Sequence, residues 1–159
     1  MTNYKYLKGV GKLTNSGVKL KVKGMYLRGR QFTHSALLLN DKTGKDYPFL
    51  HLLCLGLEII LKSALLEKDY EKYKNYIKSN LKHNLDKCLK TYIEEYPIEK
   101  FDVNLISEIK SLNEFYNSFQ LKYAMLSEIF IDPKNIESEL TLRFMAKLTE
   151  KYDKIFKLQ

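Results

Sequence analysis

The residues best suited to acid–base or phosphate chemistry are few, because the sequence holds three histidines and three arginines. Arg28 and His34 form an Arg-x5-His spacing, in which the histidine can transfer a proton and the arginine can stabilise a charged phosphate. His83 stands beside Asn84 at the expected start of a helix, where it either caps backbone groups or faces a polar pocket. Arg28, His34 and His83 are therefore the candidate catalytic residues, against structural or phosphate-contact roles for the same side chains.

A second set of polar residues lies on the most apolar stretch of the chain, residues 48–67. His51, Glu58 and Lys62 are spaced i, i+7 and i+11, so a helix places them on one stripe. The stripe is either an ion pair facing solvent or a groove, or the wall of a functional cleft or partner contact. The turn at residues 80–83 can fold back over this stripe, and His83 and Asn84 then join Glu58 and Lys62 in a polar pocket.

The cysteines and histidines do not have the spacing of a metal site. Cys54 and Cys88 lie in apolar helical contexts, which favours two buried free thiols over a disulfide. No motif for a cofactor is present, so none is expected.

The net charge of +8 is concentrated in the first quarter of the chain. Residues 1–40 contain no Asp or Glu, and the 19 basic residues after them match the 19 acidic ones. Such a segment attracts polyanions at long range, and the alternative is a solubilising tail. The candidate nucleic-acid contacts are the eight cations of this segment: Lys5, Lys8, Lys12, Lys19, Lys21, Lys23, Arg28 and Arg30.

The spacing of apolar residues predicts an all-α fold, an up-and-down bundle of about five to six helices. Asp46 and Pro48 mark the start of the central helix, and Asp132 with Pro133 marks the start of the last. The predicted helices cover 25–39, 48–67, 69–79, 84–96, a long segment from 102, and 132–156.

Residues 1–24 are expected to form a separate basic extension before a helical domain at 25–159. The run Val18 to Lys23 alternates apolar and basic residues, which is the period of a strand, and Asn15-Ser16-Gly17 is a turn signal before it. A short hairpin or an extended arm follows from that pattern.

The central helix is long enough to cross a membrane, yet Glu58 and Lys62 near its middle would be costly in lipid. A buried helix of a soluble bundle is the favoured interpretation. The polar, lysine-rich N-terminus has no signal-peptide pattern, so we expect a cytoplasmic protein without membrane contact.

Three segments together resemble the HEPN superfamily of small helical bundles. They are Glu58-x-x-x-Lys62-Ser63-Ala64-Leu65-Leu66, then Lys82-His83-Asn84-Leu85, and then Leu112-Asn113-x-x-Tyr116 followed by Leu121-Lys122-Tyr123-Ala124. Many members are metal-independent ribonucleases or accessory parts of toxin–antitoxin and phage-defence systems, often as homodimers. The resemblance covers residues 25–157 and adds Lys122 to the polar pocket of His51, Glu58, Lys62, His83 and Asn84.

The ribonuclease members carry Arg-x(4–6)-His on a late helix, and this chain has no histidine after His83. It also has Lys122-Tyr123 where an Arg-Tyr pair often stands. The resemblance therefore implies a non-catalytic accessory protein that binds RNA or a nucleoprotein complex, and Arg28, His34 and His83 are the residues left as candidates for cleavage. The alternatives are a ribonuclease with a displaced site, and an interaction module or inhibitor that docks on an acidic protein such as a nucleic-acid enzyme.

Overall fold

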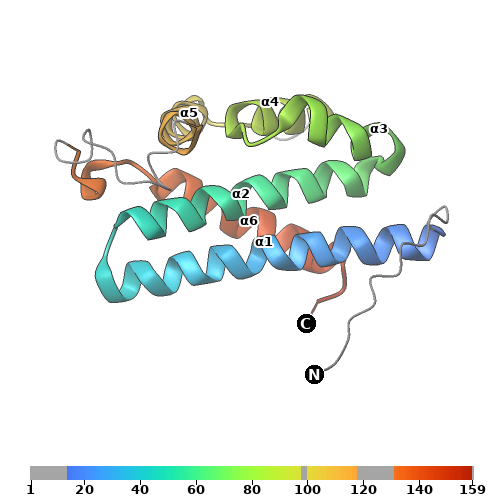
Figure 1. Cartoon of the computed structure of the whole chain (residues 1–159), viewed down its shortest axis with the longest axis horizontal. Coiled ribbons are helices and arrows are strands. Elements are labelled where there is room, and N and C mark those ends of the chain that lie inside the picture. The colour runs from blue at the N-terminus through green and yellow to red at the C-terminus, as the bar shows by residue number, and fades with distance from the viewer. Residues whose placement is uncertain (1–13, 98–99, 118–130, 159) are drawn as a thin grey trace, which may run out of the picture.

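The computed structural model describes residues 14–97, 100–117 and 131–158, and all regular structure within them is helical (Figure 1). This confirms the all-α bundle of about six helices. The helices are α1 (Asn15–Thr43), α2 (Tyr47–Lys68), α3 (Tyr70–Tyr76), α4 (Leu85–Glu95), α5 (Val103–Asn117) and α6 (Glu139–Ile155). A π-helical turn, η1 (Ile77–Leu81), extends α3, and a 3-10 turn, η3 (Pro133–Asn135), precedes α6.

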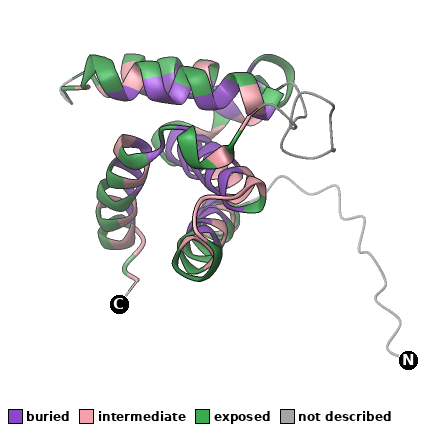
Figure 2. Cartoon of the chain, turned by 90° about the vertical axis from the view of Figure 1, so that its left-hand side faces the viewer, coloured by how far each residue is buried: buried purple, intermediate pink, exposed green. Residues whose placement is uncertain are grey.

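Helix α2 is the centre of the core. The Asp46 carboxylate caps it by accepting the N–H of Phe49 at 2.8 Å, and Pro48 lies in its first turn, as the sequence predicts. Of its most apolar 18-residue window, 78% is buried inside the fold, although the helix is long and apolar enough to cross a membrane. Figure 2 shows buried residues concentrated on α2 and on the faces turned toward it. This is the environment of a core helix in a soluble bundle.

Helices α1 and α2 run antiparallel and approach each other closely at two glycines (Figure 1). A Cβ on Gly56 would lie 2.7 Å from Thr33 Oγ1 and 3.2 Å from the Gly29 carbonyl oxygen. A Cβ on Gly29 would lie 2.9 Å from Ile60 Cγ1. The missing side chains let the two backbones meet, and this contact fixes how α1 is placed on the core.

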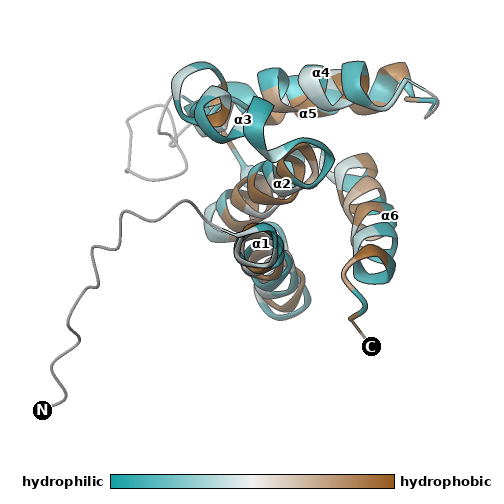
Figure 3. Cartoon of the chain, turned by 90° about the vertical axis from the view of Figure 1, so that its right-hand side faces the viewer, coloured by the Kyte–Doolittle hydropathy of each residue, from teal (hydrophilic) through white to brown (hydrophobic). Residues whose placement is uncertain are grey.

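Helices α4 and α5 lie over α2 on the side away from α1, and α6 lies beside the α1–α2 pair (Figure 3). Side chains of α5 accept hydrogen bonds from free backbone N–H groups at the starts of α4 and α6. Asn113 Oδ1 accepts the N–H of Leu85 at 2.7 Å, and Glu108 Oε1 accepts the N–H of Thr141 at 2.7 Å. Because a helix leaves its first N–H groups unbonded, these two contacts anchor α4 and α6 to α5.

The strand predicted over the run Val18 to Lys23 is not formed, because those residues are helical. Thr14 caps α1, which begins ten residues before the predicted start, so the boundary expected after residue 24 falls inside this helix. Val18, Val22 and Tyr26 recur at i, i+4 and i+8 and turn toward the core, while Leu20 is 72% exposed. A run of six residues is too short to distinguish the period of a strand from that of a helix. Burial of the face that holds Val18, Val22 and Tyr26 favours the helix. Residues 1–13 lie outside the described residues.

Helix α1 also continues through residues 40–43, predicted as a loop, and ends at Gly44 with φ of +78°. Helix α6 begins at Glu139 rather than at the predicted Pro133, where η3 forms instead. Both differences concern helix ends, where local sequence signals are least decisive.

An ion pair from Lys45 to Glu139 joins the α1–α2 loop to the start of α6 and gives a pH prediction. The hydrogen bond from Lys45, with a second from the Ser138 N–H, lowers the pKa of Glu139 from 4.5 to about 2. The folded state therefore binds fewer protons here, so the stabilisation is complete above pH 4.5 and is lost as pH falls toward 2. Because the Glu139 side chain is 56% exposed, Glu139→Gln should cost at most about 1 kcal/mol near pH 7.

Urea unfolding of the parent and of Glu139→Gln at several pH values measures this difference in unfolding free energy. The gap should close between pH 4.5 and about 2. A gap that is constant across that window would contradict the assignment of the low pKa to this ion pair.

Candidate polyanion-binding surface and polar cluster

The structure places five of the eight predicted nucleic-acid contacts on α1 between Lys19 and Arg30, and no carboxylate lies on this helix before Asp41. Arg30 Nη2 lies 3.3 Å from Asp153 Oδ2 of α6. Lys21 Nζ donates to the Tyr70 hydroxyl at 3.1 Å. Lys23 Nζ donates to the Phe156 carbonyl oxygen at 3.0 Å, near the end of α6. Lys19 and Arg28 are exposed and have no ion-pair partner among the described residues. Lys5, Lys8 and Lys12 lie outside the described residues.

A groove of about 440 Å³ lies at the start of α1, between the ends of α2 and α6 and the start of α3. Lys19, Lys23 and Lys157 contribute positive charge to its wall, and Glu67 contributes one carboxylate. The free N–H groups of the first turn of α1 add partial positive charge, and that turn holds no acidic residue. Its apolar lining includes Val18, Val22, Leu66, Tyr70, Ile155 and Phe156. The groove and the exposed cations of α1 together form an electropositive surface, here called the α1 surface.

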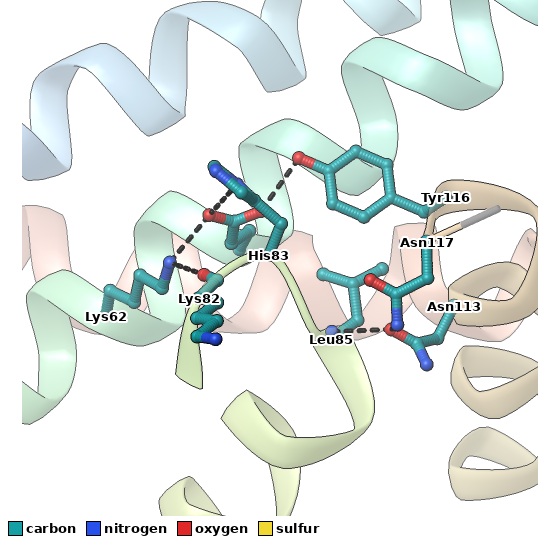
Figure 4. A network of polar contacts seen from close by, with 8 residues as sticks. Lys62, Lys82, His83, Leu85, Asn113, Tyr116 and Asn117 are labelled. Carbon is teal, nitrogen blue, oxygen red and sulfur yellow. Dashed lines mark hydrogen bonds and ion pairs between the residues drawn. The ribbon is translucent and has the colours of Figure 1, made fainter. Parts of the chain in front are cut away.

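Two residues of the predicted polar stripe, Glu58 and Lys62 of α2, form a buried cluster with residues of other elements, and Figure 4 shows its contacts. Glu58 and Lys62 are 3% and 6% exposed, and Lys62 Nζ donates to Glu58 Oε1 at 2.7 Å. The Tyr116 hydroxyl of α5 donates to Glu58 Oε2 at 2.7 Å. His83 Nδ1 lies 3.2 Å from Glu58 Oε1. The turn before α4 therefore folds back over the stripe, as proposed from the sequence.

The backbone of that turn also takes part in the cluster. Lys62 Nζ donates a second hydrogen bond to the carbonyl oxygen of Lys82, a residue with φ of +46°. A buried ammonium group needs several hydrogen-bond acceptors. The carbonyl oxygen of Lys82 is one of them, and Lys82 has a positive φ, a backbone conformation that is rare for a residue with a side chain. The sequence does not reveal this role, because the contribution comes from the backbone.

The remaining residues of the predicted pocket are placed differently. The His51 ring packs against the Tyr116 ring with centroids 5.8 Å apart. Asn84 caps α4 by accepting the N–H of Lys87 at 2.8 Å, so its side chain serves the helix start. Lys122 lies outside the described residues. Tyr116 was not among the predicted pocket residues, although it belongs to the Leu112-Asn113-x-x-Tyr116 segment that carries the family resemblance.

Burial keeps the hydroxyl and thiol groups around Glu58 protonated. Burial, followed by the charge and hydrogen bond of Glu58, raises the pKa of Tyr116 above its ordinary value, so its hydroxyl remains a donor. Burial also raises the pKa of the Cys88 thiol to about 12 and raises that of Cys54 further. Both free thiols are buried, which makes them structural rather than reactive.

The candidate catalytic residues do not come together in one site. Arg28 and His34 are six residues apart on α1, so they point about 120° apart and lie about 9 Å apart along the axis. His34 lines a different groove between α1 and α6, together with Arg30, Leu37 and Leu142. The side chain of His83 is 71% exposed and contacts Glu58. The described residues place no group of three or more His, Cys, Asp or Glu where it could hold a metal ion.

Neither protein-family models, nor curated proteins, nor solved structures compared with this chain give a match.

Proposed function

We propose that this chain is a HEPN-like, non-catalytic accessory protein that binds RNA or a nucleoprotein complex through the α1 surface, in a defence or toxin–antitoxin setting. The observation that carries the proposal is the segment from Lys19 to Arg30 of α1, which follows the start of the cationic groove and bears five cations and no carboxylate; of these five, Arg30 alone has an ion-pair partner among the described residues. Binding to phosphates is driven by such unneutralised charge. The distance between Arg28 and His34 on the helix argues against a joint catalytic role.

The HEPN-like part of the proposal is supported by the way the three resembling segments meet. Glu58 and Lys62 come from the first, Lys82 and His83 from the second, and Tyr116 from the third. Lys62, His83 and Tyr116 each contact Glu58, and Lys82 contacts Lys62 through its carbonyl oxygen. Residues spread over 58 positions of sequence thus act as one structural unit. A homodimer and a cytoplasmic location remain predictions of the resemblance and of the sequence.

The test is binding of a fluorescent single-stranded RNA at several salt concentrations, measured by anisotropy with the full chain. Neutralising Lys19, Lys21 and Arg28 as glutamines should lower the slope of log affinity against log salt by about 2, since each phosphate contact contributes about 0.7. Affinity at about 50 mM salt should fall by about tenfold or more. A shorter chain lacking residues 1–13 measures the contribution of Lys5, Lys8 and Lys12. A deletion to residue 24 is unsuitable, because it removes the buried Val22.

The matched control neutralises three exposed lysines that lie outside the described grooves, Lys78, Lys110 and Lys134. This control lowers the net charge by the same three units as the α1 variant, and it should leave most of the affinity for RNA intact. Absence of RNA binding at about 50 mM salt, or an equal loss in the control, would remove the proposal. Binding to an acidic protein but to no RNA would instead favour the interaction module or inhibitor.

The Glu58–His83 contact favours a second candidate, a metal-independent ribonuclease with a displaced site. A carboxylate beside Nδ1 orients an imidazole and leaves Nε2 for proton transfer, and the ring of His83 is exposed. RNA cleavage in the presence of a chelator should then be lost in His83→Ala and kept in His34→Ala. Cleavage that persists in both variants excludes this candidate.

A further inference from the structure

A second positively charged groove lies on the other side of α6 from the α1 contact, between the residues that lead into α5 and the first three turns of α6. Its volume is about 590 Å³, and four cations line it: Lys100, Arg143, Lys147 and Lys151. One carboxylate, that of Asp102, also lines it, so the lining carries a formal charge of +3. The Asp102 carboxylate already accepts the N–H of Asn104 at 2.9 Å at the start of α5.

Several lysines elsewhere on the helices have a carboxylate partner, whereas three of the cations in this groove have none among the described residues. Lys72, Lys74, Lys90 and Lys154 each form an ion pair with a nearby Glu or Asp. Within the part of the chain that the structure describes, Lys100, Arg143 and Lys147 form none. Positive charge that is held together in a concave site raises the local concentration of anions.

Three of the cations follow one line along α6. Arg143, Lys147 and Lys151 are spaced i, i+4 and i+8, which gives a rise of about 6 Å between neighbours on one helix face. Like charges at this spacing destabilise a helix by about 0.2–0.5 kcal/mol per pair, and neither Arg143 nor Lys147 forms an ion pair with a described residue that would relieve the repulsion. A local conflict of this kind is typical of a binding site.

The groove also presents aromatic and apolar surface beside the charges. Phe101 and Phe144 pack edge to face with centroids 5.8 Å apart, and Leu140 lies alongside. Lys151 Nζ lies 4.3 Å from the centroid of the Tyr96 ring and donates to the Tyr92 hydroxyl at 3.2 Å. These contacts fix the position of one ammonium group, while the half-buried Phe101 offers a ring for stacking.

We infer that the groove between α5 and α6 binds a nucleoside phosphate, with the phosphate on Arg143 and Lys147 and the base against Phe101 and Leu140. A ligand with a charged end and a flat apolar body matches both parts of the lining, and about 600 Å³ is within the usual size of small-molecule sites. The source of the ligand is either a free nucleotide or one nucleotide of a single RNA strand. The inference rests on residues outside the α1 surface and does not depend on its function.

The test uses isothermal titration of the full chain with adenosine monophosphate, adenosine, inorganic phosphate and a short oligoadenylate. The monophosphate or the oligoadenylate should bind about tenfold or more tightly than adenosine or inorganic phosphate, because each of these lacks one half of the ligand. The variant Arg143→Gln with Lys147→Gln should lose about tenfold of that affinity. Both residues are exposed, and far-UV circular dichroism checks that the variant remains helical.

The control variant, Lys110→Gln with Lys134→Gln, removes the same charge elsewhere and should bind as the parent does. Neutralising Lys19, Lys21 and Arg28 of the α1 surface should leave binding of the monophosphate unchanged. Binding of the monophosphate assigns a free nucleotide, and binding of the oligoadenylate alone assigns a nucleotide within RNA. No binding of either, equal binding of inorganic phosphate, or an unaffected Arg143/Lys147 variant would overturn the inference.

Discussion

Replacing Gly56 with alanine is expected to destabilise the fold by about 2 kcal/mol or more, because the new methyl group has no space between α1 and α2. Its Cβ would lie 2.7 Å from Thr33 Oγ1, 3.1 Å from the Thr33 backbone nitrogen and 3.2 Å from the Gly29 carbonyl oxygen. Two of these three atoms belong to the backbone, so a side-chain rotation cannot relieve the clash. The gain of about 1 kcal/mol in helix propensity from Gly to Ala offsets only part of this cost.

Gly24 provides a matched control, since it also lies within a long helix and a Cβ there would meet nothing within 4 Å. Gly24→Ala should therefore stabilise the protein by about 0.5–1 kcal/mol. Urea unfolding followed by circular dichroism gives both values, with the parent as reference. Equal changes in unfolding free energy for the two variants would contradict the close approach of α1 and α2 at Gly56.

Local signals in the sequence predict much of this helical architecture. Asp46 and Pro48 identify the start of α2, and the spacing of Glu58 and Lys62 identifies the polar stripe that His83 then covers. The first two features depend on residues within a few positions of one another. The contact of His83 depends on the turn between η1 and α4, which follows α2 closely in the sequence. The run from Val18 to Lys23 shows the limit, because its alternation fits a strand while its i, i+4 pairs fit a helix. Contact with the core favours the helix.

Features that depend on distant partners could not be predicted in the same way. Tyr116 is 58 residues from Glu58, and Glu108 caps a helix 33 residues later. The spacing of Arg143, Lys147 and Lys151 is visible in the sequence, but whether a carboxylate neutralises them depends on the packing of α5 against α6. The N-terminal charge suggested one cationic surface, and the second groove was missed because the later part of the chain is neutral overall.

The buried pair of Glu58 and Lys62 gives the prediction with the largest expected effect. Lys62→Met should destabilise the protein by about 3–5 kcal/mol, because it leaves the Glu58 carboxylate buried without its counter-charge. Glu58→Leu should have an effect of similar size, because it leaves a buried ammonium whose remaining acceptor is the Lys82 carbonyl oxygen. The Tyr116 hydroxyl also loses its acceptor in that variant.

The double variant Glu58→Leu with Lys62→Met should recover more than half of the loss of either single change, because no buried charge remains. It should stay below the parent by about 1–3 kcal/mol, since Tyr116 and the Lys82 carbonyl keep unsatisfied polar groups. Non-additivity of this size is the signature of two charges that are buried together.

Asp86 and Lys90 offer a matched surface pair with the same i, i+4 spacing and a distance of 2.8 Å against 2.7 Å. The Lys90 side chain is 64% exposed, and Lys90→Met should cost only about 0.5 kcal/mol or less. Unfolding in urea at pH 7 compares the variants. A Lys62→Met variant that is no less stable than Lys90→Met would show that the Glu58 carboxylate finds water or another cation, and that the cluster is more open than its burial indicates.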